Sequence, residues 1–250
     1  MDLKKAALTA DLSKIAYSEQ QECRDQIINL GYGEFAWFDH EGTQAFACRK
    51  SNASDIFIVF RGTEPNQMRD LLADAKAWRK PARERGLVHF GFAQALDKVY
   101  DSIVRWIDEQ NLDGERNITC TGHSLGAALA TIMASRLDAN ELYTFGSPRV
   151  GNRDFVKEIK NDGVKHYRFV NNNDVVTKVP FPIRFVHHGE LVYINHYGNI
   201  RKMSPWQRFK DQWRGRMRAL SKGQPFDGIC DHSMELYNKK VKNVFIQSQK

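Results

Sequence analysis

A serine with a glycine two residues away on each side is the clearest chemical signal in the sequence. It is Ser124, in the run Gly122-His123-Ser124-Leu125-Gly126. A serine hydroxyl at the tip of a sharp strand-to-helix turn stands clear of the sheet, and the turn is so tight that it needs flanking glycines. The helix that follows directs free N–H groups and the positive end of its dipole at the reaction centre. This pattern predicts that Ser124 is a nucleophile.

A serine nucleophile needs a base, and the base needs a carboxylate that orients it. Asp174 lies in a polar loop directly after a predicted strand, His166–Val170. Catalytic groups of parallel sheets lie at such strand ends. Asp154 and Asp162 are less well placed, because they fall in a predicted surface helix and at its exit. We therefore expect Asp174 to be the orienting carboxylate.

Four histidines that follow Asp174 are candidates for the base. His232 lies where a loop enters the last predicted helix, and it is the favoured candidate. His187 and His188 precede a predicted hairpin, which gives them a structural explanation, and His196 follows them. These three remain alternatives to His232.

The elements that must position these residues alternate between strand and helix. Asp55–Phe60 is a continuous apolar run, typical of a strand buried on both faces. Apolar spacing predicts a helix over Phe92–Gln110, and small aliphatic residues predict another over Leu125–Leu137. Further strands are expected at 34–38, 45–49, 117–122, 142–145 and 166–170, and a helix from Leu3 to about Leu30. The alternation indicates a sheet of βαβ units covered by helices.

The composition is that of an ordinary globular protein. With 250 residues the chain is long enough for one complete core, so we expect a single domain over residues 1–250. A hydrophobic fraction of 42% argues against disorder. A mean hydropathy of −0.55 and the lack of an 18-residue apolar run argue against a membrane span. The net charge of +7 suits an anionic partner, such as a lipid interface or nucleic acid.

Cysteine content and the first residues leave the native compartment open. The four cysteines are too few for a disulfide scaffold and lack metal-ligand spacing, so mostly buried thiols are expected, with one bridge an alternative in an exported protein. Residues 1–8 lack the apolar core of a secretory signal. Three cases agree with these observations: a cytoplasmic protein, a protein exported by another route, and a mature form whose signal has been removed.

Several motifs together resemble those of the class 3 lipase family, the fungal-type triacylglycerol lipases. The resemblance covers about Asp11 to Tyr237, and its motifs occur in the family's order. It implies an α/β-hydrolase fold, with a mostly parallel central sheet flanked by helices and a lid segment over the active site. The matching segments are Val59–Thr63, Val88–Phe92, Gly122–Gly126, Thr144–Asn152 and Asn171–Val176.

The resemblance also implies how the catalytic machinery is completed. Ser124, Asp174 and His232 correspond to the family's catalytic triad. Backbone N–H groups of Thr63 and Leu125 correspond to its oxyanion hole, and the Thr63 hydroxyl is a candidate third donor. Ester hydrolysis by this machinery needs no metal and no organic cofactor.

The family's lid corresponds to about residues 64–87. Residues 66–73 predict a short amphipathic helix, which is able to swing from the site toward lipid. The resemblance also implies an acidic lid residue beside the oxyanion hydroxyl, so we expect the Asp74 carboxylate to accept a hydrogen bond from Thr63 Oγ1 and to fix the Thr63 rotamer. A solvated carboxylate is the alternative for Asp74. A fixed, solvated loop is the alternative for this segment. Five cations, Lys76, Arg79, Lys80, Arg83 and Arg85, are expected to meet anionic head groups.

A second basic, amphipathic segment extends from Pro205 to Leu220. Its aromatic and aliphatic residues follow helical spacing, with cations on the other faces. Such a stripe more often packs on its own domain than lies on a membrane, so packing is the favoured interpretation. The segment resembles an insertion before the His232 loop, so either way it is expected to border the active site.

The favoured function is a serine hydrolase that cleaves carboxylic esters of lipids, as a triacylglycerol lipase or carboxylesterase. Phospholipase A1-like and phenolic-ester (feruloyl-type) activities are alternatives, because the family resembled includes all of them. A binding protein that lost catalysis is a distant alternative, since all three triad positions hold competent residues. Nucleic-acid binding is not expected, because only charge supports it. The oligomeric state is open.

Overall fold

The computed structural model describes residues 1–63, 79–81, 86–110, 116–180, 182, 184–221 and 227–249. Its centre is a seven-stranded sheet in the order β1-β2-β3-β6-β7-β8-β9. The first three strands pair antiparallel, and β3 onward pair parallel. The strands are β1 (Glu34–His40), β2 (Thr43–Arg49), β3 (Asp55–Phe60), β6 (Asn117–His123), β7 (Glu141–Phe145), β8 (Lys165–Asn171) and β9 (Glu190–Ile194). The sheet is therefore mostly parallel, as expected.

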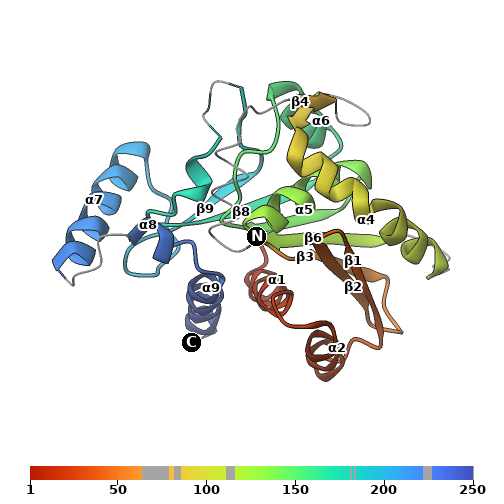
Figure 1. The fold of residues 1–250 in the computed structure, drawn as a ribbon. Coiled ribbons are helices and arrows are strands. Elements are labelled where there is room, and N and C mark those ends of the chain that lie inside the picture. Colours follow the sequence, from red (N-terminus) through yellow and green to blue (C-terminus); the bar gives the residue numbers. More distant parts are fainter. Residues whose placement is uncertain are drawn as a thin grey trace.

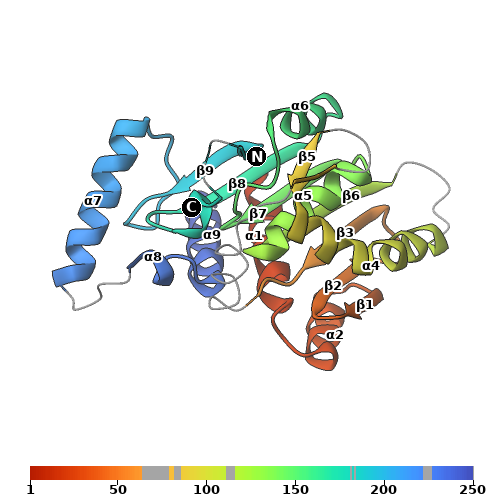
Figure 2. The same ribbon diagram turned by 45° about the horizontal axis from the view of Figure 1, so that its top comes forward.

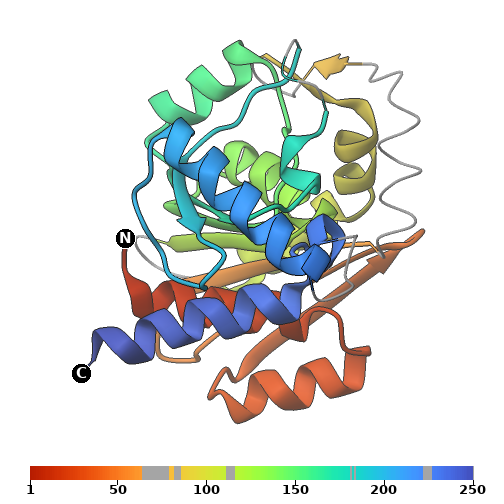
Figure 3. The same ribbon diagram turned by 90° about the vertical axis from the view of Figure 1, so that its left-hand side faces the viewer.

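Helices cover both faces of the sheet (Figure 1). One face carries α4 (Phe90–Glu109) and α5 (Leu125–Arg136), with α6 (Arg153–Asn161) at one end. The other carries α1 (Leu3–Ile15), α2 (Gln20–Asn29) and α9 (Met234–Ser248). α1 and α9 lie side by side although they are at opposite ends of the chain (Figure 3). Smaller elements complete the fold: β4 (Arg79–Pro81), β5 (Leu87–His89), η1 (Val176–Lys178), α7 (Pro205–Ser221) and α8 (Asp227–Cys230).

The apolar run of β3 explains why the sheet is buried on both faces. Ile56, Ile58 and Phe60 pack with α4 and α5 in one core, whereas Phe57 and Val59 pack with α1 and α2 in another. Successive side chains of a strand point to opposite faces, so a strand covered on both sides must be apolar throughout. The fold is the α/β-hydrolase fold.

The predicted strands and the two central helices are confirmed, with shifts of one or two residues at their ends. The single N-terminal helix expected from Leu3 to about Leu30 is wrong, because α1 ends at Ile15 and α2 begins at Gln20. Glu19 has an extended backbone there, which redirects the chain. The break lets α1 pack beside α9 while α2 packs against β1.

The favoured interpretation of the Pro205–Leu220 stripe is also wrong. The helix forms as α7, but Trp206, Phe209, Trp213 and Met217 are exposed. α7 stands at one edge of the molecule, away from the helices that cover the sheet (Figures 1 and 2). Within the part of the chain that the structure describes, no helix is long and apolar enough to cross a membrane.

Candidate active site

Ser124 lies at the sharp turn between β6 and α5. Its backbone has φ 58° and ψ −125°, a conformation that non-glycine residues rarely adopt. The Ser124 N–H donates to the Phe145 carbonyl at the end of β7, which holds the turn against the sheet (3.0 Å). The strain and this hydrogen bond together support a fixed serine side chain above the carboxyl edge of the sheet.

The flanking glycines are required by close backbone approach. A Cβ on Gly122 would lie 2.5 Å from the Gly126 carbonyl, and one on Gly126 would lie 2.2 Å from the Phe60 carbonyl. A Cβ on Gly62 would lie 2.6 Å from the His123 carbonyl and 3.1 Å from Ser124 Cβ. Two segments, the end of β3 and the turn after β6, therefore meet at van der Waals distance beside the serine.

The structure brings Ser124, His232 and Asp174 into one hydrogen-bonded chain. Ser124 Oγ is 2.7 Å from His232 Nε2, and His232 Nδ1 is 3.0 Å from both carboxylate oxygens of Asp174. Asp174 is fully buried and the other two are almost fully buried. Since Asp174 accepts from Nδ1–H, Nε2 is left to accept the serine proton.

Two further donors hold the Asp174 carboxylate. The Val176 N–H donates to Oδ1 at 2.9 Å, and the Tyr237 hydroxyl donates to Oδ2 at 2.6 Å. Tyr237 in turn accepts from the Asn171 N–H at 2.8 Å. Burial and the adjacent carboxylate keep the pKa of Tyr237 well above its ordinary value, so the hydroxyl keeps its proton. The carboxylate is thus oriented from both η1 and α9.

His123, inside the serine motif, supports the backbone of His232. Its Nε2–H donates to the His232 carbonyl at 2.7 Å, so its Nδ1 accepts from the Tyr17 hydroxyl at 2.7 Å. Burial, followed by the proximity of His232, holds the pKa of His123 well below its ordinary value. His123 is therefore a neutral bridge between the N-terminal segment and the catalytic histidine loop.

Gly146 directly follows β7 and lies beside Asp174 and His232. Its φ is 61°, and a Cβ there would lie 2.8 Å from Asp174 Oδ2 and 2.9 Å from His232 Nδ1. Any side chain at this position would separate the two groups. A glycine is required for both its backbone conformation and this contact.

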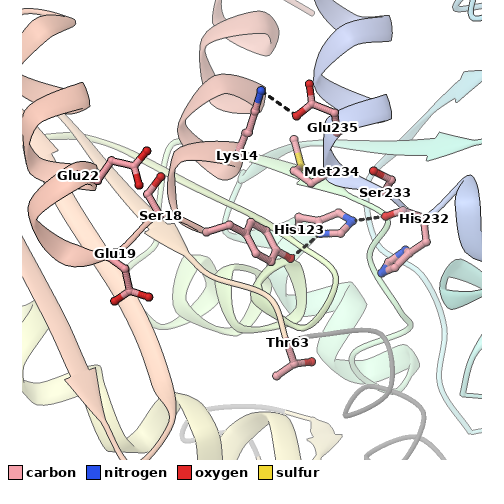
Figure 4. A pocket seen from close by; sticks show the side chains of 11 residues that line it. Lys14, Ser18, Glu19, Glu22, Thr63, His123, His232, Ser233, Met234 and Glu235 are labelled. Atoms are coloured by element: carbon pink, nitrogen blue, oxygen red, sulfur yellow. Dashed lines mark hydrogen bonds and ion pairs between the residues drawn. The ribbon is translucent and has the colours of Figure 1, made fainter.

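Two cavities share Thr63 as a lining residue. One, of about 580 Å³, is lined by Thr63, His123 and His232 and by residues of α1, α2 and α9 (Figure 4). The other, of about 250 Å³, lies at Thr63, Leu125 and Leu129. The expected oxyanion residues Thr63 and Leu125 therefore border the space where an ester would lie. Thr63 Oγ1 is buried and has no hydrogen-bond partner among the described residues.

The larger cavity has an acidic wall. Glu19, Glu22 and Glu235 line it, with Lys14 as the cation on this wall (Figure 4). Lys14 Nζ is 2.8 Å from Glu235 Oε2, so one of the three carboxylates is already paired. Among the described lining residues, carboxylates therefore outnumber cations.

The alternative catalytic candidates lie elsewhere. His187 donates from Nε2 to the Thr177 carbonyl, His188 contacts His166, and His196 contacts Asp211. Asp154 accepts from the Asn152 amide at the start of α6, and Asp162 caps the end of that helix. None of these five contacts Ser124 in the described structure.

The predicted lid, about residues 64–87, lies mostly outside the described residues. So do Asp74 and the side chains of Lys76, Arg79, Lys80, Arg83 and Arg85. The described parts, β4 and β5, pair antiparallel with each other. The hydrogen bond between Asp74 and Thr63 therefore stays a prediction.

Sequence reasoning missed Tyr17, His123, Gly146 and Tyr237 as parts of the site. Tyr17 follows α1 and is distant in sequence from every catalytic candidate, so no local pattern marks it. The other three did carry a signal: His123 and Gly146 lie within motifs that match the family, and Tyr237 lies five residues after His232. Their roles depend on contacts between distant segments.

Similarity to known proteins agrees with this geometry and gives the protein's family. The profile of the lipase (class 3) family matches residues 57–183, slightly more than half of the chain. The protein belongs to this family of α/β-hydrolases.

Individual relatives differ in what they act on. A chloroplastic phospholipase A1 of Arabidopsis thaliana is 43% identical over 97 residues, 36% of this chain and 22% of that protein. A secreted mono- and diacylglycerol lipase of Malassezia restricta is 27% identical over 202 residues, 72% of this chain and 64% of that protein. The matched part thus spans less than two thirds of either relative.

The fold has solved counterparts. The triacylglyceride lipase of Rhizomucor miehei superposes with a TM-score of 0.63 at 25% identity, covering 77% of this chain and 80% of that one. The family profile ends at residue 183, so α7 and the His232 loop lie beyond it.

Proposed function

We propose that the protein is a serine ester hydrolase that cleaves carboxylic esters of lipids through an acyl-enzyme. The observation that carries the proposal is the chain from Ser124 Oγ through His232 to buried Asp174, with His232 opening on a 580 Å³ cavity. The lipases among its relatives support a glyceride as substrate.

The reaction follows from this arrangement. Ser124 Oγ attacks the ester carbonyl as His232 Nε2 takes its proton, and Asp174 stabilises the resulting imidazolium. The N–H groups of Thr63 and Leu125 bind the oxyanion of the tetrahedral intermediate. His232 then protonates the leaving alcohol, and the acyl-enzyme remains. Water, activated by His232, hydrolyses it and releases the fatty acid.

The acidic cavity favours an uncharged leaving alcohol. The leaving oxygen takes its proton from His232, so the alcohol departs beside the wall that holds Glu19, Glu22 and Glu235. A phosphate would meet unfavourable charge there, whereas a glycerol or partial glyceride would not. A phospholipase A1 activity remains the second candidate, because the Arabidopsis relative is the one with 43% identity over its matched part.

The basic net charge of +7 supports a transient association with anionic lipid interfaces. We expect the lid cations to contribute to it. Their test is a salt series on two substrates: hydrolysis of a lipid ester in anionic vesicles should fall as salt rises, while hydrolysis of a short soluble ester responds much less. Replacing Arg79, Lys80 and Arg83 with Gln should remove the difference. Equal salt dependence of both substrates would contradict this role.

The activity is tested with a fluorophosphonate probe and a panel of substrates. We expect the probe to label the wild-type protein and not Ser124→Ala. Turnover should be higher on mono-, di- and triacylglycerols than on phosphatidylcholine or a feruloyl ester. Absence of labelling would favour a binding protein on the same fold, and faster phospholipid cleavage would favour the phospholipase. A Glu19→Gln/Glu22→Gln variant lacks two carboxylates of the cavity, so its ratio of turnover on glycerides to turnover on phosphatidylglycerol should be smaller than in the wild type.

A further inference from the structure

α7 reverses the usual orientation of an amphipathic helix. Its small and polar residues Asp211, Gly215 and Ala219, spaced by four, are buried against the body of the protein. Trp206, Phe209 and Trp213 are 62%, 56% and 58% exposed, and Met217, on the same side, is 50% exposed. Surface helices ordinarily turn their apolar side to the core. Here the apolar side is the solvent side.

Polar contacts on the inner side hold this orientation. Asp211 accepts from the Tyr193 hydroxyl at 2.9 Å and from the His196 N–H at 3.1 Å. Gln212 Nε2 donates to the Asn172 carbonyl at 3.0 Å. A Cβ on Gly215 would lie 2.3 Å from the Asn172 amide nitrogen, so the helix lies directly on the loop that leads to Asp174.

We call the four residues Trp206, Phe209, Trp213 and Met217 the outer face of α7. Their spacing of three, four and four places them in one stripe. The Trp206 and Phe209 rings stack with centroids 5.5 Å apart, and Lys210 Nζ lies 5.2 Å from the Trp206 ring centroid. The stripe is therefore apolar along its length and begins with a stacked aromatic pair.

Positive charge surrounds this surface. α7 carries five cations, and its single carboxylate is Asp211, which is buried on the inner side. Lys210, Arg214 and Arg216 are exposed beside the outer face. Aromatic residues flanked by cations are the combination that inserts into the head-group region of an anionic bilayer.

We infer that the outer face of α7 docks the protein on anionic phospholipid surfaces. The inference rests on the proposed function, because a lipid-ester hydrolase must reach substrate held in such a surface. Charge complementarity favours lipid over a second copy of the chain, since two symmetric copies would bring Lys210, Arg214 and Arg216 against the same three cations. Because α7 packs on the Asn172 loop, docking brings the site's border to the lipid.

Vesicle binding tests the inference, with Ser124→Ala protein so that lipids are not consumed. We expect co-sedimentation with phosphatidylcholine vesicles that contain phosphatidylglycerol, and much less with phosphatidylcholine alone. Trp206→Ser/Phe209→Ser/Trp213→Ser should weaken binding roughly tenfold or more. The matched control Ile28→Ser/Ile246→Ser removes two comparably exposed apolar residues and should bind as before. Circular dichroism confirms that each variant folds.

The charge contribution has its own matched pair. Lys210→Gln/Arg214→Gln/Arg216→Gln should weaken binding to anionic vesicles by about fivefold for each cation removed at low salt. Arg153→Gln/Lys157→Gln/Lys160→Gln removes the same charge from exposed positions of α6 and should weaken it far less. Equal effects of the two variants would mean that net charge alone drives binding, and would overturn the inference.

Tryptophan fluorescence reports insertion directly. Vesicles with brominated phospholipid chains should quench the wild-type emission, and Trp206→Phe/Trp213→Phe should lose most of this quenching while it keeps binding. Quenching that survives this replacement would overturn the inference. So would a concentration-dependent dimer in sedimentation velocity that the triple serine variant abolishes.

Hydrolysis separates this inference from the proposed function. If docking is right, the ratio of vesicle-ester turnover to soluble-ester turnover falls in the triple serine variant. If the wild type hydrolyses a soluble ester, but the wild type and the triple serine variant bind vesicles equally well, the docking inference alone is overturned. Vesicle binding through α7 without hydrolysis of any ester overturns the proposed function alone.

Discussion

Two groups of buried or half-buried histidines lie at different ends of the parallel strands: the His232 group follows the carboxyl ends, and the second group lies where β8 and β9 begin. Among the described residues, only the first group is paired with a carboxylate. His232 pairs with Asp174 and contacts Ser124, with His123 behind it. In the second group, His166 contacts the Thr144 hydroxyl and His188. His187 donates to the Thr177 carbonyl.

The second group is held neutral. Burial, and then the charge of Arg168, lower the pKa of His187 to about 3 and that of His188 to about 4. Protonation there is unfavourable, because burial disfavours the imidazolium and none of the described residues places a carboxylate against these two rings. The comparison teaches that a buried histidine serves as a base only where a carboxylate and an open cavity are both supplied.

The largest expected effect separates the two groups directly. Ser124→Ala and His232→Ala should each lower kcat by about 10⁴-fold or more, and the double variant should cost no more than either single one. His188→Gln, in the second group, should keep kcat within about threefold. Ester hydrolysis by purified, folded variants measures this. An active His232→Ala protein with an inactive His188→Gln protein would reverse the assignment.

Removing the carboxylate should make the first group resemble the second. In Asp174→Asn the amide is able to donate to Nδ1, which forces the proton onto Nε2, where it faces Ser124. We expect kcat to fall by about 10³- to 10⁴-fold with the fold intact. The check is single-turnover acylation by a chromogenic ester together with thermal unfolding. Near-normal acylation by a folded variant would show that His232 does not need this partner.

The groups around the triad should matter less than the triad itself. Tyr237→Phe removes the donor to Asp174 and leaves the Asn171 N–H without its acceptor, so kcat should fall roughly tenfold. Tyr17→Phe removes one neutral hydrogen bond to His123, and about a fivefold loss is expected. Both should leave KM nearly unchanged, because neither group is expected to bind substrate. A change confined to KM would contradict a positioning role.

The smallest effect is on stability at low pH. The unfolded chain protonates His187 and His188 near their ordinary pKa of 6.5, whereas the folded protein does so only near pH 3 and 4. Their contribution to the free energy of unfolding is therefore complete above pH 6.5 and is lost as the pH falls toward 4.

Urea unfolding between pH 7 and 4.5 measures this loss. Each of the two histidines adds at most about 1.4 kcal/mol per pH unit to the slope of the free energy of unfolding against pH. His188→Gln should give a shallower dependence of unfolding free energy on pH than wild type. Parallel curves for the two proteins would show that His188 is not held neutral.

Local sequence patterns were enough to predict most helices and strands and the residues proposed to react. The apolar run of β3, the glycines around Ser124 and the polar loop at Asp174 are local signals, since burial, tight turns and strand ends each restrict residue type over a few positions. The alternation of strands and helices predicted a sheet of βαβ units, and the family resemblance implied that the sheet is mostly parallel. His232 was preferred over His187 because it lies where a loop enters the last predicted helix. The spacing of the α7 stripe also predicted that helix.

The surroundings of each side chain could not be predicted in this way. The spacing of Trp206, Phe209 and Trp213 is the same whether the stripe packs or is exposed, and the contacts of Asp211 and Gly215 with the body settled it. Tyr17 reaches His123 because the chain bends between α1 and α2, and Tyr237 reaches Asp174 because α9 packs beside α1. Such contacts join segments far apart in the chain, where the spacing of residues carries no information about distance.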